Sequence, residues 1–180
     1  MAITDKKTGV WGLDQVFDKQ NQGSIWTNNR SGLLMLMGNW WGNTPVYLFS
    51  SPVQIPGTKW VTASGGGYST LGIQTDGTLW AWGTGTSGNL AQNDTASYPS
   101  PPVQVGSDAT WNRAKMGRSY GVATKTDGTL WAWGTNEGGQ LGQNEQDGDL
   151  TSRSSPTQIG TDTTWNYIAC DGYAMIATKT

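Results

Sequence analysis

The hydrophobic positions of this chain fall into short runs separated by turn-forming residues. The run 130–133 is apolar at consecutive positions and follows an Asp-Gly pair. Because successive side chains of a strand point to opposite faces, Trp131 and Trp133 would share one face, and Leu130 and Ala132 the other. A strand that is apolar on both faces is covered on both faces, so the pattern predicts a strand buried between two layers.

An Asp-Gly pair joins this run to the extended run 121–126 before it. Asp-Gly between two extended runs is a strong hairpin signal, because a type I′ turn needs positive φ and Gly adopts it without steric cost. Asp127 and the matching Asp76 recur at one repeat position, which resembles the arrangement of site residues, but their place before Gly favours turn chemistry. We therefore predict antiparallel hairpins in which both aspartates are structural.

The whole pattern is repeated. Residues 75–84 return unchanged at 126–135, an offset of 51 residues (126 − 75). A lone tryptophan precedes each copy, and a worn copy at 32–38 carries Leu and Met in place of Trp. A fixed period of this length indicates stacked units that bury their faces against one another.

The repeat resembles that of the regulator-of-chromosome-condensation family, Asp-Gly-x-Leu/Val-Trp-x-Trp-Gly-x-Asn-x-x-Gly-Gln-Leu-Gly followed by a proline-bearing loop. Residues 127–142 fit almost throughout, and 76–91 fit apart from Gly85, Asn89 and Ala91. This resemblance covers roughly residues 32 to 180 and implies β-propeller blades. We expect an all-β fold, a partial propeller of about three antiparallel units of four-strand type, with boundaries near 32–82, 83–133 and 134–180.

The last of these units is incomplete, because the aspartate of its hairpin would fall one position after Thr180. The family implies seven blades, which at this period need on the order of 350 residues. We therefore expect these residues to be the N-terminal part of a longer chain. The alternative is that another subunit supplies the missing strand, since an unpaired edge invites aggregation.

Residues 1–31 lie outside the repeat and form a predicted docking segment. Leu13, Val16 and Phe17 have helical spacing, with Trp11 before them. A helix this short must dock, either as a cap on the first unit or as an anchor on another protein. The stretches 7–13 and 22–26 also resemble the N-terminal leader of structural proteins in tailed bacteriophages.

Composition narrows the function classes. Eleven Trp, 26 Gly and 13% charged residues in 180 fit a rigid, turn-rich β protein. A net charge of −2 argues against a nucleic-acid partner, the absence of His removes His-based catalysis and metal sites, and the single Cys170 excludes an internal disulfide framework. No apolar run is long enough for membrane insertion. We expect no enzymatic activity, no catalytic residue, no cofactor and no bound metal.

Together these features predict a non-enzymatic bacteriophage virion protein, a tail, fibre or capsid-surface component located in an extracellular particle that is made in the host cytoplasm. It would form a homo-oligomer, attach to other virion subunits and display loop 145–155 to a host-surface protein or glycan. One alternative is a cellular interaction or scaffold propeller that regulates a protein partner; another is a carbohydrate-binding module. The predicted docking residues are Trp11, Leu13, Val16, Phe17, Trp40 and Trp41.

Overall fold

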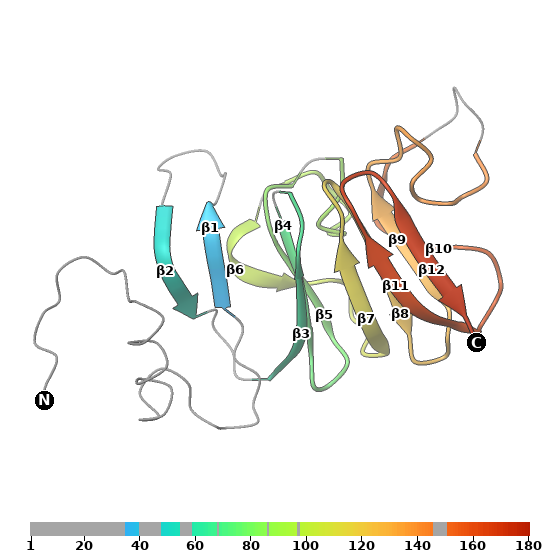
Figure 1. Ribbon diagram of the computed structural model, residues 1–180, viewed down its shortest axis with the longest axis horizontal. Helices are drawn as coiled ribbons and strands as arrows, with labels where there is room; N and C mark the ends of the chain where they lie inside the picture. The colour runs from blue at the N-terminus through green and yellow to red at the C-terminus, as the bar shows by residue number, and fades with distance from the viewer. Residues whose placement is uncertain are drawn as a thin grey trace, which may run out of the picture.

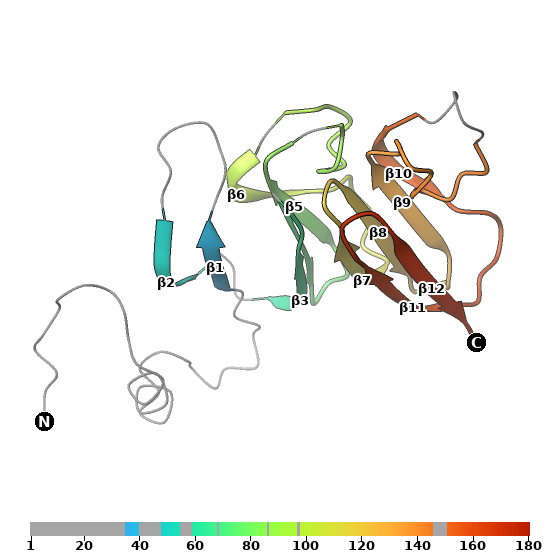
Figure 2. The same cartoon turned by 45° about the horizontal axis from the view of Figure 1, so that its top comes forward.

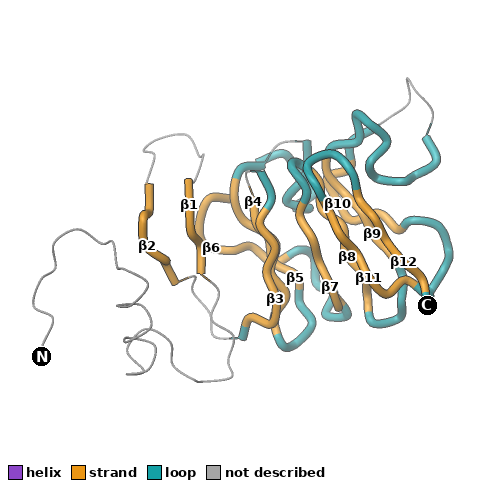
Figure 3. Tube along the Cα trace, in the orientation of Figure 1, coloured by secondary structure: helices purple, strands orange, loops and turns teal. Residues whose placement is uncertain are grey.

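The computed structural model describes residues 35–39, 48–54, 59–67, 69–85, 87–96, 98–145 and 151–180. These residues form strands, turns and loops, with no helix among them (Figure 3). None of them therefore lies in a helix that could cross a membrane. The all-β prediction is confirmed, and the predicted N-terminal helix lies outside the described residues.

Two antiparallel sheets have four strands each. The first full blade has the order β3-β4-β5-β6, and the second has the order β7-β8-β9-β10. The strands of the first are Trp60–Gly65, Ser69–Gln74, Leu79–Gly83 and Tyr98–Gln104. Those of the second are Trp111–Met116, Tyr120–Lys125, Leu130–Gly134 and Arg153–Gln158.

Two further sheets have only two strands each. The N-terminal half blade pairs β1 (Met35–Asn39) with β2 (Leu48–Gln54), and the C-terminal half blade pairs β11 (Trp165–Cys170) with β12 (Met175–Lys179). Figure 1 and the turned view in Figure 2 show the N-terminal half blade on the side of the first full blade, whereas the C-terminal half blade lies against the second full blade.

Tryptophan rings fill the space between the two full blades. Trp133 is fully buried in one cluster with Leu71 and Leu79 of the first full blade, and its Nε1 donates to the Asn89 carbonyl at 2.9 Å. Within the second blade, Trp111 contacts the rings of Trp131 and Trp133 with centroids 6.1 and 6.3 Å apart, close to edge-to-face. Adjacent sheets thus bury each other's indoles.

The opposite face of β9 is covered by the C-terminal half blade. Leu130 and Val122 form a buried cluster with Ile168 of β11. The prediction of a strand that is apolar and covered on both faces is therefore confirmed for β9.

The hairpin turns differ from the predicted type I′. Gly77 N donates to the Gln74 carbonyl and Gln74 N donates to the Thr78 carbonyl, each at 3.0 Å, so the loop has three residues. Only its last residue, Gly77, has positive φ, at 81°, and Asp76 does not. This arrangement is the type I turn with a glycine bulge that three-residue hairpins adopt. The hairpin was predictable from Asp-Gly, but the turn type was wrong.

Candidate interaction site

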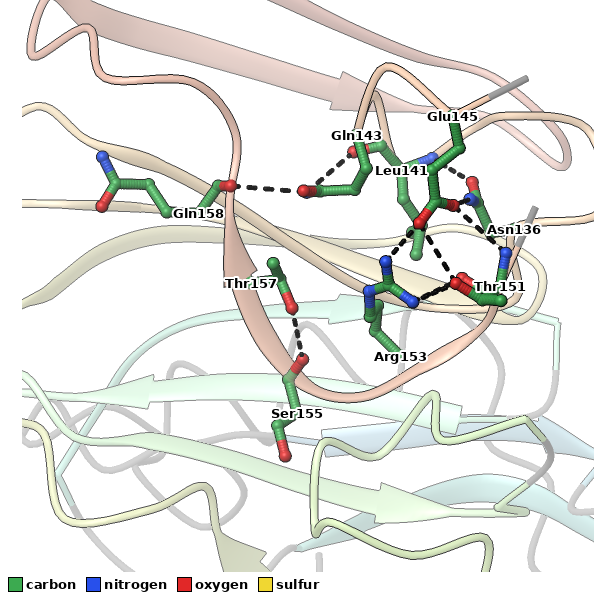
Figure 4. Close-up of polar contacts among 9 residues, drawn as sticks. All are labelled: Asn136, Leu141, Gln143, Glu145, Thr151, Arg153, Ser155, Thr157 and Gln158. Carbon is green, nitrogen blue, oxygen red and sulfur yellow. Dashed lines mark hydrogen bonds and ion pairs between the residues drawn. The ribbon is translucent and has the colours of Figure 1, made fainter. Parts of the chain in front are cut away.

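The loop between β9 and β10 holds a group of polar side chains that contact one another (Figure 4). We call Asn136, Glu145, Thr151 and Arg153 the loop cluster. Asn136 follows β9 and Arg153 begins β10, so the two strands fix both ends of the group. The loop is thus tied together by side chains as well as by its backbone.

Asn136 is the buried member of the cluster and holds the loop through two hydrogen bonds. Its side chain is buried, its Oδ1 accepts a hydrogen bond from Leu141 N at 3.0 Å, and its Nδ2 donates to Glu145 Oε2 at 2.6 Å. A buried amide with both ends paired fixes one loop conformation, because breaking either bond would leave a buried polar group unsatisfied.

Glu145 is the centre of the cluster. It accepts from the backbone N and the hydroxyl of Thr151, each at 3.1 Å, and pairs with the Arg153 guanidinium. The Thr151 backbone hydrogen bond, with help from Arg153, lowers the pKa of this carboxyl below its usual range. The carboxylate therefore stays ionised while Arg153 offsets its charge.

A shallow pocket of about 360 Å³ lies beside the cluster. Its lining is made of amide side chains, glycines and one carboxylate: Asn136, Gly139, Gly142, Gln143, Asn144 and Glu145. No group of three or more potential metal-ligating carboxylates or thiols occurs among the described residues. Amides on a glycine floor offer hydrogen bonds to a neutral polar surface, such as the backbone of another protein.

The matching loop of the first full blade is braced differently. Asn89 is fully buried there, and its Nδ2 donates to Ser69 Oγ at 3.0 Å and to the Thr84 carbonyl at 3.1 Å. At the repeat position of Asn89 the second blade has Gln140, whose side chain accepts from Gly138 N on the loop surface. In the second blade the buried amide of this loop is therefore Asn136, and the shallow pocket lies beside it.

One bond is common to both loops. Gln92 Nε2 donates to the Gln104 carbonyl at 3.2 Å, and the equivalent Gln143 Nε2 donates to the Gln158 carbonyl at 3.5 Å. These bonds fasten each loop to the last strand of its own blade. The two repeats therefore share this contact between loop and strand, and they differ in the polar side chains that the loop carries.

The recurrent aspartates have structural roles, as predicted. Asp127 Oδ1 accepts from the backbone N and hydroxyl of Thr129 at 3.0 and 2.7 Å, and the Thr129 hydroxyl accepts from Trp131 Nε1 at 2.8 Å. Asp76 makes the same contacts to Thr78. In both turns the threonine hydroxyl bond lowers the pKa of the aspartate.

A lysine–aspartate pair recurs at the same strand ends as these turns, away from the loop cluster. Lys125 Nζ lies 2.6 Å from Asp108 and 3.8 Å from the centroid of Trp131, and Lys179 pairs with Asp162 in the C-terminal half blade. The Lys125 hydrogen bond lowers the pKa of Asp108 to about 2. These pairs lie along strand ends and brace the sheet.

Exposed apolar side chains gather on the C-terminal half blade. Tyr167, Tyr173 and Ile176 are 54, 69 and 66% exposed. Cys170 is half-buried between this half blade and the second full blade, and burial raises the pKa of its thiol to about 11. The thiol is therefore protonated and unreactive at neutral pH.

The predicted docking residues are not among those that the structure describes. This applies to the N-terminal set with Trp11 and Phe17 and to the pair Trp40 and Trp41. Only the ends of the predicted display loop 145–155 are described. Glu145, Thr151 and Arg153 lie in that predicted loop, but their contacts with one another and with Asn136 were not predicted. The available signal was the change from Gly85 and Asp94 to Asn136 and Glu145 between aligned copies.

Comparisons with known proteins agree with this architecture. The family model of the regulator of chromosome condensation (RCC1) repeat matches residues 127–176. Residues 127–176 thus carry an RCC1 repeat. The chain is 36% identical over 75 residues to the RCC2 homolog of Danio rerio, which covers 41% of this chain and 15% of that protein. It is 30% identical over 89 residues to the regulator of chromosome condensation of Xenopus laevis, which covers 49% of this chain and 21% of that protein.

Among solved structures, Prp20p of Saccharomyces cerevisiae superposes with a TM-score of 0.64 at 21% identity, over 78% of this chain and 35% of Prp20p. This similarity shows the RCC1-repeat propeller fold. The chain spans about a fifth or less of the length of these curated relatives and about a third of the solved structure.

The prediction of a bacteriophage virion protein is wrong. Relatives of the repeats include a regulator of chromosome condensation and RCC2 proteins from animals, and the structural neighbours include yeast RCC1, none of which is a virion component. The predicted partners, other virion subunits and a host-surface protein or glycan, and the predicted location in an extracellular particle are corrected with it. The misleading signal was a resemblance over a short leader that lies outside the described residues.

Proposed function

We propose that this chain is part of a cellular β-propeller that binds a protein partner and scaffolds or regulates it, without catalysing a reaction itself. The observation that carries the proposal is the contrast between the loop that joins β9 to β10 in the second full blade and the matching loop that joins β5 to β6 in the first. Blade-building contacts recur in both full blades, whereas the loop cluster of Asn136, Glu145, Thr151 and Arg153 occurs in one. In a repeat scaffold, residues that depart from the shared frame at a rigid surface are candidates for recognition.

The chemistry of this surface suits another protein. Arg153 keeps 32% of its side chain exposed beside an amide-lined pocket, and Asn136 holds the loop in one conformation. A pre-organised surface loses little conformational entropy on binding, and arginine is a frequent interface anchor. A structural neighbour supports the partner class, since Prp20p, the yeast RCC1, binds Gsp1p and histones and is also known bound to Kap60.

Affinity purification with matched variants tests this proposal. The wild-type chain, Arg153→Glu and the control Asp162→Ala, which removes an exposed ion pair at the other strand ends, would each be immobilised after circular dichroism confirms folding. Proteins retained from an extract would be compared by mass spectrometry and their affinities then measured with the purified partner. We expect Arg153→Glu to lose about tenfold or more in affinity, since buried interfacial charges of the wrong sign are costly. Equal binding by all three chains would contradict a partner site at this loop.

A further inference from the structure

The first strands of neighbouring sheets converge. Strand β7 contacts both β3 and β11, whereas no comparable contact joins the described fourth strands β6 and β10. Figure 1 and Figure 2 show β7 between the other two first strands. Met116 N donates to Ser64 Oγ of β3 at 3.1 Å. Arg118 N donates to the Gly172 carbonyl, in the turn after β11, at 3.3 Å. We call the surface of these three strands the inner edge, since propeller blades converge on their axis in this way.

Two cations project from β7 at the inner edge. Ala114 and Met116 are buried, whereas Arg113 and Lys115, which alternate with them, are exposed. Because strand side chains alternate between faces, Arg113 and Lys115 share one face and lie about 7 Å apart along the strand. Strands β3 and β11 flank β7 on its two sides, so this exposure does not arise from an end of the chain.

A third cation follows in the turn after β7. The Arg118 guanidinium carbon lies 5.2 Å from the centroid of the Tyr173 ring, in the turn between β11 and β12. A guanidinium at this distance is attracted to the face of the ring, which restricts its position. Burial raises the pKa of the Cys170 thiol, and the nearby charge of Lys115 partly opposes that rise. Lys115 and Arg118 are therefore both close to the C-terminal half blade.

We call Arg113, Lys115 and Arg118 the basic strip. Within the described parts of the chain none of the three forms an ion pair, because the carboxylates that are paired there bind other cations. Residues 109–126, which include the strip, contain neither Asp nor Glu. In a chain with a net charge of −2, the strip is thus a local concentration of positive charge that would attract an anion.

The blade does not need these charges. The first full blade builds the same strand pair, with the same register shift after its tryptophan, from neutral residues at the three positions. The C-terminal half blade also has neutral residues there. The neutral residues are Thr62, Ser64 and Gly67 in the first blade and Tyr167, Ala169 and Gly172 in the half blade. The cations are therefore additions to a frame that forms without them, as expected of residues that recognise a ligand.

We propose that the basic strip binds an acidic segment of another protein in extended conformation. Side chains on one face of an extended segment repeat about every 7 Å, which matches the spacing of Arg113 and Lys115. Carboxylates of such a segment would form charge-assisted hydrogen bonds with both cations and with Arg118. Three cations on an acidic chain are few for a nucleic-acid backbone, which is held by a larger basic surface.

This surface is separate from the loop cluster. The strip lies on a first strand and the turn after it, whereas the loop cluster joins the third and fourth strands of the same blade. The proposal therefore adds a second contact surface to the chain. Its failure would leave the proposed function of the loop cluster intact.

Fluorescence anisotropy tests the proposal with a labelled peptide of about ten residues that alternates Glu and Ser, at about 20 mM salt to limit screening. The double variant Arg113→Thr, Lys115→Ser carries the residues of the first blade and should keep its fold, as circular dichroism would check. We expect its Kd for the peptide to rise about tenfold or more. The matched control, Lys59→Thr with Lys179→Gln, removes two cations at the strand ends opposite Arg118 and should change Kd less than about twofold.

Carbodiimide coupling locates the bound peptide, because it joins a carboxylate to a lysine amine in direct contact. Peptide mapping should place the cross-link at Lys115. Lys115→Arg should bind with unchanged affinity, since it keeps the charge, and should lose that cross-link. Failure of the wild type to bind, equal Kd values for the two double variants, or a cross-link mainly at other lysines would overturn the proposal. Tighter binding of a single-stranded oligothymidylate with the same number of charges would also overturn it, by assigning the strip to nucleic acid.

Discussion

The second full blade and the C-terminal half blade carry the same repeat positions and bury them differently. Val122 is fully buried and Ile176 is two-thirds exposed; Trp111 is 4% exposed and Trp165 is half-buried. The local strands are alike, with the same pairing and the same register shift after the tryptophan. Burial in this protein is thus supplied by the neighbouring sheet and not by the strand itself, as expected of a stack in which each unit covers the next.

The largest expected difference between the two regions concerns their first-strand tryptophans. Trp111→Ala should lower the free energy of unfolding by about 4 kcal/mol, because it removes a buried indole that contacts two others. Trp165→Ala should cost less than half as much. Urea denaturation followed by circular dichroism measures both values, and equal losses would mean that the half blade is covered as fully as the complete one.

Backbone crowding gives the next largest contrast. Gly128 has φ +78°, and a Cβ there would lie 2.0 Å from the carbonyl oxygen of Thr163, in the loop between β10 and β11. Gly160 has φ +60° with open space around it. Gly160→Ala should cost about 1 kcal/mol for the left-handed conformation alone, whereas Gly128→Ala should cost about 3 because the hairpin turn and the loop must also move apart. Similar losses in thermal or urea unfolding would show that the turn does not contact its neighbour closely.

Truncation of Val122 and of Ile176, which occupy the same repeat position, compares the burial of the two regions directly. Val122→Ala should destabilise the chain by about 2 kcal/mol through lost burial and a cavity. Ile176→Ala removes more carbon but should change the free energy of unfolding of this chain by less than about 0.5 kcal/mol, since that side chain is already in water. An equal effect of the two changes would contradict the burial difference.

The smallest expected effect concerns the ion pair at the strand ends. The folded-state pKa of Asp108, about 2, lies below its ordinary value of 3.8, so the pair contributes stability above about pH 4 and loses it as the pH falls towards 2. Both partners remain partly exposed, so Asp108→Asn should cost about 1 kcal/mol or less at pH 6. The difference between variant and wild type should vanish near pH 2 in a pH series of urea titrations. A constant difference across that range would assign the effect to packing.

The sequence predicted most of what depends on local pattern. The repeated string located the hairpins, and alternation placed Trp131 and Trp133 on one face and Leu130 on the other, as the structure shows. Turn geometry was not predictable from Asp-Gly, because the pair fits both a two-residue loop and a three-residue loop with a glycine bulge. The choice depends on Gly77 N bonding to the Gln74 carbonyl.

The candidate site was harder to predict from the sequence than the fold. Asn136 and Arg153 meet at Glu145 only after β9 and β10 have paired, so their spacing in sequence carries no signal of the contact. The function was the hardest feature to predict from the sequence. The repeat determines a scaffold that unrelated proteins share, and a short leader resemblance outweighed it in the wrong direction.

Hydrogen exchange of the wild-type chain tests the central claim most directly, because it reports on β8 and β12 in one molecule. The account predicts slow exchange of the amides of Tyr120–Lys125. It predicts fast exchange of the amides of Met175–Lys179 in the same 180-residue chain. Equal protection of the two strands would contradict the claim that neighbouring sheets supply the burial.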